Sequence, residues 1–372
     1  MSMERRIVFW GAALVAFLLF MFVFSPILLP FVAGMALAYM LDPVADWFER
    51  RGFSRLSATM TILVLFVLAV VAVLLLVLPI LINQVTTLVA DFPGYVRRVE
   101  DLLEQLLTSA WAENLGVDPQ TVRSSVSDYL NQGSRWFTTV IPSIWSGGLA
   151  FINLLALAVV TPVVAFYMLY DWDRMVDKVD SWLPRDSVGD IRAIARDIDR
   201  VIAGFVRGQA VVGLTLGTFY ASGLVLIGVN FGFLIGLVAG VISFIPYVGT
   251  TLGFVASVGI ALVQFWPDWI WIVATAALFV TGQLLEGYVL QPYFIGGHVG
   301  LHPVWLMFAL FAFGLLFGFV GLLVAIPAAA AVGVLVRYGL KRYLQSPIYR
   351  GERGLPADTA QPRREPAKSR KK

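Results

Sequence analysis

The chain has 372 residues, of which 59% are hydrophobic and only 14% are charged, and its mean hydropathy is +0.82. About a quarter of the residues of a soluble domain are charged, so a soluble globule of this composition would lack the polar surface to cover itself. The chain has no cysteine, which excludes disulfides and thiolate metal sites, and its net charge of +3 is too small to indicate a nucleic-acid partner.

Charged residues are distributed unevenly along the chain. Only Arg207, Asp268 and Glu286 carry a charge between positions 205 and 336, whereas 171–200 holds six basic and eight acidic residues and 337–372 holds eleven basic and three acidic ones. A charge at the centre of a bilayer costs at least about 2.5–3.5 kcal/mol, so this segregation is typical of an integral membrane protein.

The first apolar run, 7–41, is too long for a single span and has Pro26 and Pro30 in its middle. We therefore expect two helices, about 7–24 and 27–41, joined by a tight turn. A signal peptide is the alternative, but the run is longer than a signal sequence requires.

Six further spans follow from hydropathy, which gives eight crossings. We expect them at about 58–82, 146–170, 205–229, 230–263, 269–290 and 303–336. The runs 230–263 and 303–336 are longer than a bilayer requires, and each contains a proline, Pro246 and Pro327. Each is either a single broken helix or a re-entrant pair.

The predicted fold is all-α, a polytopic transmembrane helical bundle with a small helical extracytoplasmic domain. The positive-inside rule places both termini, the Arg50–Arg55 loop and the basic tail in the cytoplasm, and the acidic segment 83–145 outside. We expect six parts: N-terminal transmembrane helices (1–82), the outer domain (83–145), a transmembrane helix (146–170), a cytoplasmic amphipathic segment (171–204), a transport core (205–340) and a disordered basic tail (341–372). Within the fourth part, 190–202 has the pattern of a helix lying on the membrane surface.

Three features of the second half exceed what a passive bundle requires. The first is the stretch that contains Pro246, Tyr247, Gly249 and Thr250 inside an apolar run. Proline and glycine favour a helix break, and in transporters broken helices build substrate or ion sites with their exposed backbone dipoles. A simple proline kink is the alternative.

The second feature is a pair of polar residues, Gln283 and Glu286, three positions apart and hence on one helix face. A glutamate at membrane depth must be protonated, paired or hydrated, and each state suits a proton- or sodium-coupled site. Two alternatives stay open: Glu286 lies at this depth, or it lies near a helix end and reaches the surface. Its only candidate basic partner within the membrane is Arg207.

The third feature is the Gly- and Pro-rich connection after Gln291, which contains both histidines, His298 and His302. These side chains could titrate or bind substrate, although capping and loop hydrogen bonds are the commoner role. The chain carries no metalloprotease, serine-hydrolase or Walker pattern, so we predict that it is not an enzyme and that it holds no cofactor and no metal.

Four stretches, in this order, resemble the autoinducer-2 exporter family of bacterial membrane proteins, the PerM-type permeases: LDPVADWFERRGFSR (41–55), FIPYVGT (244–250), GQLLEGYVLQPYFIGGHVGLHP (282–303) and LLFGFVGLLVAIPAA (315–329). The resemblance extends over residues 5–340 and implies an inner-membrane carrier without an ATPase domain. Some relatives are described as exporters of the furanosyl-borate signal and others as Na⁺(Li⁺)/H⁺ antiporters. Family members often carry basic residues where Tyr293 and His298 stand here, so the resemblance does not extend to an anion-binding role for this loop.

We therefore expect a secondary transporter in the bacterial inner membrane that moves a small polar solute, or a signalling molecule such as autoinducer-2, by alternating access. Its partners would be this solute, a coupling ion, membrane lipids and further copies of the chain. The predicted substrate or ion site consists of Gln283, Glu286, Pro246, Tyr247, Gly249, Thr250, Gln291 and His298.

Two other functions remain possible from the sequence. One is a Na⁺(Li⁺)/H⁺ antiporter that uses Glu286 with Thr250 or Thr251. The other is a non-transporting membrane scaffold whose outer domain and basic tail recruit partners, although a scaffold has no need of broken helices within the membrane.

Overall fold

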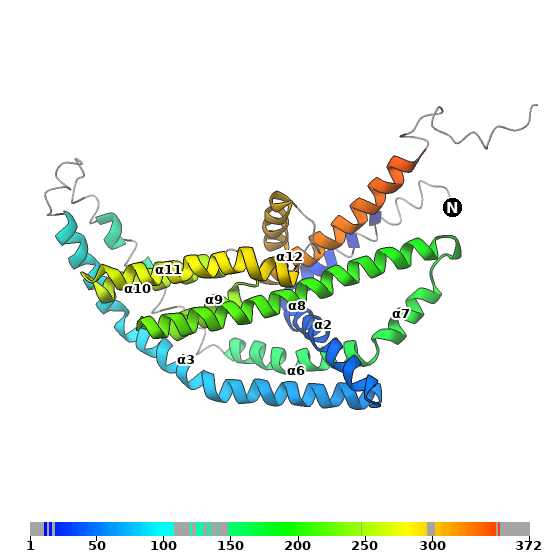
Figure 1. Cartoon of the computed structure of the whole chain (residues 1–372), viewed down its shortest axis with the longest axis horizontal. Helices are drawn as coiled ribbons and strands as arrows, with labels where there is room; N and C mark the ends of the chain where they lie inside the picture. Colours follow the sequence, from blue (N-terminus) through cyan, green and yellow to red (C-terminus); the bar gives the residue numbers. More distant parts are fainter. Residues whose placement is uncertain are drawn as a thin grey trace, which may run out of the picture.

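The computed structural model describes residues 11–12, 15–16, 19–107, 120, 124–128, 132–133, 135, 139, 148–246, 248–295, 302–346 and 349. Every regular element in these ranges is a helix (Figure 1). Among the described residues, six helices are long and apolar enough to cross a bilayer, and a bent helix pair gives a seventh candidate. The predicted all-α, multi-pass fold is therefore confirmed. Much of the expected outer domain after residue 107 and part of the expected first span, 7–24, lie outside the described residues.

The first half of the described chain contains three long helices: α2 (Leu29–Arg50), α3 (Arg55–Leu107) and α6 (Gly148–Tyr170). The 3-10 turn η1 (Ser25–Ile27) precedes α2, as the prolines there predict. α2 approaches α6 closely at Gly34, where a Cβ would lie 2.7 Å from the Cβ of Val164. Apolar side chains from all three helices form a small core: Ala38, Ala45, Ile62 and Leu169.

α3 is much longer than the span expected at 58–82. It has 53 residues, about 80 Å at 1.5 Å per residue, and it contains Pro79 and Pro93. In Figure 1 it runs along one side of the molecule and then curves round one end. Residues 83–107, the first part of the expected outer domain, therefore continue α3 instead of starting a new helix.

Five helical segments follow in the second half: α8 (Val188–Ile227), α9 (Gly232–Ile242), α10 (Val248–Phe265), α11 (Trp269–Leu285) and the π-helix η3 (Glu286–Ile295). α8 was expected as two elements, a surface helix at 190–202 and a span from 205, but it is one uninterrupted helix. The expected separation into two elements was wrong, and the apolar face of the first part packs against protein. Val201 forms a core with Ala330 and Val334, and Ile194 and Ile198 pack against this core.

The apolar run 230–263 is a helical hairpin. α9 has 11 residues, about 16 Å, and is too short to cross the hydrocarbon. The two open ends of the hairpin lie together, because the Asn230 amide donates to the Gln264 side chain at 2.8 Å and Gln264 donates to the carbonyl of Gly228, also at 2.8 Å. The hairpin thus enters and leaves beside the end of α8.

The last helix, α12 (Pro303–Gln345), is also divided in two. Its break lies at Gly318, whose φ of 60° and ψ of −138° are outside the helical region. The two arms diverge from this point in Figure 1. The prediction of a break at Pro327 was wrong. The rest of a membrane bundle can satisfy the carbonyl that a proline frees, whereas only glycine adopts the Gly318 conformation without strain.

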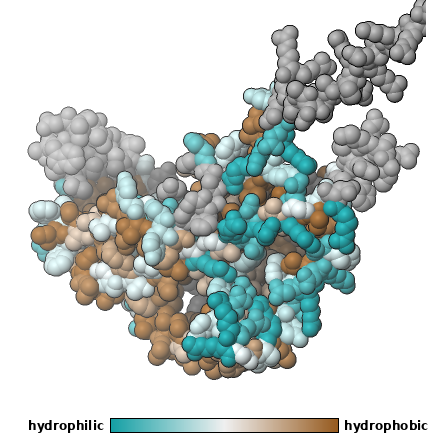
Figure 2. All heavy atoms as spheres, turned by 45° about the vertical axis from the view of Figure 1, so that its right-hand side comes forward, coloured by the Kyte–Doolittle hydropathy of each residue, from teal (hydrophilic) through white to brown (hydrophobic). Residues whose placement is uncertain are grey.

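At one end of the molecule the short helix α7 (Trp172–Ser181) meets the beginning of α8 (Figure 1). Figure 2 shows this end brought forward, with hydrophilic side chains over it. Ion pairs tie its elements together: Arg192 lies 2.6 Å from Asp180, and Arg342 lies 3.0 Å from Asp190. The positive-inside rule predicts that this end faces the cytoplasm.

Candidate functional site

The α9–α10 hairpin packs against α8 through glycines. A Cβ on Gly240 would overlap the backbone of Gly217, and a Cβ on Gly236 would overlap the backbone of Ala221. At the start of α10, a Cβ on Gly249 would overlap the backbone of Ser243. Small residues therefore allow both arms of the hairpin to approach neighbouring backbone closely, as at other membrane helix interfaces.

The tip of the hairpin lies in the interior and its backbone is satisfied by side chains. Gln209 of α8, which is 3% exposed, donates to the carbonyl of Ser243 at 2.6 Å, and the Ser243 hydroxyl donates to the carbonyl of Gly240 at 2.6 Å. A break in a membrane helix is stable only when the freed carbonyls find partners of this kind. The predicted break near Pro246 and Gly249 is confirmed as a true interruption, since α9 ends at Ile242 and α10 begins at Val248.

The carboxylate of Glu286 is buried beside this tip. Glu286 is 2% exposed and lies where α11 ends and the π-helix η3 begins. Thr250, in the first turn of α10, donates to one carboxylate oxygen at 3.4 Å, and Gln291 donates to the other at 3.1 Å. The positive end of the α10 dipole therefore lies near the acid, and π-helical turns are frequent at functional sites.

An aromatic pair adjoins this cluster on α8 and α11. The ring of Tyr220 stacks on Phe279 with centroids 4.4 Å apart, and Gly282 leaves the space that the tyrosine fills. The Tyr220 hydroxyl is buried and lies near Thr250 and Glu286. The aromatic pair therefore adds a buried hydroxyl to the polar groups around Glu286.

The structure brings together Glu286, Thr250 and Gln291, with Pro246 and Gly249 in the adjoining tip. Gln283 is half-buried one turn before Glu286 and does not hydrogen-bond to it. Tyr247 and His298 lie outside the described residues.

Sequence analysis suggested Arg207 as the basic partner of Glu286, but Arg207 has other partners. It donates to the carbonyl of Tyr39 at 2.7 Å and lies 3.5 Å from Asp42. Within the part of the chain that the structure describes, the Glu286 carboxylate is held by neutral donors alone. The acid therefore lacks the compensating cation that a purely structural buried carboxylate usually has.

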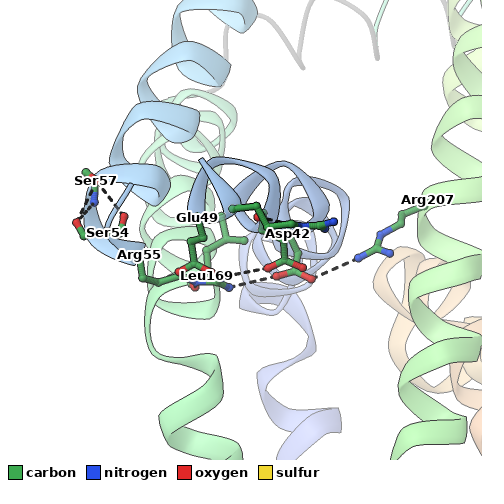
Figure 3. Close-up of polar contacts among 9 residues, drawn as sticks. Asp42, Glu49, Ser54, Arg55, Ser57, Leu169 and Arg207 are labelled. Carbon is green, nitrogen blue, oxygen red and sulfur yellow. Dashed lines mark hydrogen bonds and ion pairs between the residues drawn. The ribbon is translucent and has the colours of Figure 1, made fainter. Parts of the chain in front are cut away.

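Sequence analysis did not recognise a second polar cluster between α2 and the start of α3. Arg55 donates to Asp42, Asp46 and Glu49 at 3.1–3.2 Å and to the carbonyl of Leu169 at 2.8 Å (Figure 3). The three acids occur at positions i, i+4 and i+7 and hence share one helix face. This spacing is the sequence pattern from which the cluster could have been predicted. Asp42 is shared between this cluster and Arg207, so it links the first helices to α8.

A cavity of about 1230 Å³ lies between α2, α8 and α12. Its charged end contains Tyr39, Asp42, Asp199 and Arg207, and Phe244 of the hairpin tip also lines it. The residues of the Glu286 cluster are absent from its lining, so the hairpin tip stands between the cavity and the buried acid.

Interior backbone breaks, a buried acid without a cation and a bundle of spanning length are features of membrane carriers. Comparison with known proteins agrees with this class. The chain belongs to the AI-2E transporter family, because the model described as "AI-2E family transporter" matches residues 12–341.

Relatives of similar length carry transport names. The chain is 29% identical over 329 residues to the "Putative transport protein YrrI" of Bacillus subtilis (strain 168), which covers 87% of this chain and 89% of the relative. It is 28% identical over 321 residues to the "Putative permease PerM" of Escherichia coli (strain K12), with 85% and 88% covered. The protein is thus a multi-pass membrane transporter.

Proposed function

We propose that the protein is an ion-coupled secondary transporter that exports a small polar solute, such as autoinducer-2, across the bacterial inner membrane. The observation that carries the proposal is the carboxylate of Glu286, which is 2% exposed and receives hydrogen bonds from Thr250 and Gln291 but from no cation among the described residues. Such an acid changes its charge state when a proton or a metal cation arrives, and this change is the basis of coupling.

The helices α2 and α3 of the first half contact α8 and the α9–α10 hairpin of the second half at two places, and these two sets of contacts support alternating access. At the charged end, the Tyr39 hydroxyl donates to Asp199 at 3.0 Å, beside the contacts of Arg207 with α2. At the other end, the Gln84 side chain accepts from the amide of Leu234 at 2.9 Å, and Asn230 donates to the Tyr95 hydroxyl at 2.9 Å. We propose that these two sets open in alternation and expose the hairpin tip first to one side and then to the other.

The alternative that the geometry favours is exchange of Na⁺ or Li⁺ for protons at the same acid. Thr250 supplies a hydroxyl oxygen next to the carboxylate, and hard cations prefer oxygen ligands. Thr251 is exposed and does not belong to this arrangement.

The experiment uses purified protein in liposomes with imposed proton or sodium gradients. We expect Glu286→Gln to abolish gradient-driven uptake of autoinducer-2 while the protein stays folded. Asp268→Asn is the matched control, because Asp268 is the other acid of 205–336 and is exposed. Gradient-driven flux at the wild-type rate in Glu286→Gln would refute the coupling role. Proton release on addition of Na⁺ without an organic solute would favour the antiporter.

A further inference from the structure

The large cavity between α2, α8 and α12 has two chemically different ends. At one end stand three arginines and two aspartates: Arg196, Arg200, Arg207, Asp42 and Asp199. The rest of the lining is apolar, with Leu28 and Met35 on one wall and Phe317 and Val324 on another. Along α2, the distance from Asp42 to Leu28 is 14 residues, about 21 Å. One leaflet of hydrocarbon is about half of 30 Å, so the apolar part has room for an acyl chain.

Both acids at the charged end are already engaged. Asp42 accepts from Arg55 and lies 3.5 Å from Arg207, and Asp199 accepts from the Tyr39 hydroxyl. The lining as a whole therefore carries one more positive than negative charge.

One arginine of the lining has no acidic partner among the described residues. Arg200 pairs with Asp197 at 3.0 Å, but Arg196 donates only to the carbonyl of Arg192, at 3.2 Å. Arg196 and Arg200 are four positions apart, so they share one face of α8 at the mouth of the cavity. A guanidinium in this position suits the phosphate of an amphiphile whose chain fills the apolar part.

We propose that this cavity binds one anionic phospholipid of the leaflet at the charged end. Its phosphate would lie on Arg196 and Arg200, and an acyl chain would lie along α2 and the two arms of α12. Because Phe244 of the hairpin tip lines the same cavity, a bound lipid contacts the element that adjoins Glu286. The site is independent of the proposed coupling, so loss of transport in Glu286→Gln would leave it unchanged.

The test measures lipid bound to purified, delipidated protein by native mass spectrometry during titration with phosphatidylglycerol. We expect Arg196→Gln to weaken binding about fivefold, since one basic side chain near a lipid headgroup contributes on the order of 1 kcal/mol. Arg174→Gln is the matched control: its side chain is 76% exposed and it does not line the cavity.

A second pair of variants tests the apolar part without changing any charge. Ala328→Phe narrows the cavity and should reduce lipid occupancy. Val332→Phe should not, because Val332 lies one turn further along the same helix, is 54% exposed and does not line the cavity. Equal affinity of wild type and Arg196→Gln would overturn the proposal. So would equal binding of uncharged diacylglycerol, or displacement of the lipid by millimolar inorganic phosphate, which would indicate a site for a free anion.

Discussion

Replacing Arg55 with leucine tests how the first helices are held together. The side chain is 18% exposed and donates four hydrogen bonds, three to carboxylates that are 36–46% exposed and one to the carbonyl of Leu169. A charge-assisted bond to a part-buried carbonyl contributes about 1.5 kcal/mol, and each half-exposed ion pair about 0.5 kcal/mol. The expected loss in the free energy of unfolding is about 3 kcal/mol, and the three acids are then left to repel one another.

The assay is thermal unfolding of the purified protein in a mild detergent. A loss of this size lowers the unfolding midpoint by roughly 5 °C in a chain larger than 250 residues. Arg55→Lys should give an intermediate shift, because one ammonium cannot reach all four acceptors. Arg174→Leu is the control, since Arg174 is 76% exposed and pairs with Asp171 at 3.5 Å. If Arg55→Leu shifts the midpoint no more than this control, the cluster does not stabilise the fold.

Three further variants address the hairpin and its surroundings. Gly240→Val should lower both the unfolding midpoint and the transport rate, because the new side chain overlaps the backbone of α8. Gly259→Val is the control: a side chain at Gly259 meets open space, so neither measurement should change. Gln209→Leu leaves the carbonyl of Ser243 without its donor and should cost about 1–3 kcal/mol in unfolding experiments; an unchanged midpoint would show that another group satisfies it. Tyr220→Phe removes a buried hydroxyl near Thr250 and Glu286 and should lower the apparent affinity for the solute; unaltered transport kinetics would exclude a role in binding.

Local chemistry in the sequence determined much of this protein. Apolar runs of about 20 residues without charge are stable only as membrane helices, so most spans were predictable, as was the interruption near Pro246. Glu286 stood out for the same local reason, because few charges occur in the surrounding apolar sequence. The family resemblance also rested on short stretches that can be read without coordinates.

Tertiary packing alone decided how these pieces meet. Thr250 and Glu286 are 36 residues apart, and Arg207 and Asp42 are 165 apart, so neither contact follows from helical spacing. The chain of α12 turns at Gly318, and this turn lets the second arm pack against the start of α8. The position of the break therefore depends on this packing, and the proline at 327 did not predict it. Hydropathy measures how well a residue tolerates lipid, but it carries no information about which distant side chain lies beside it.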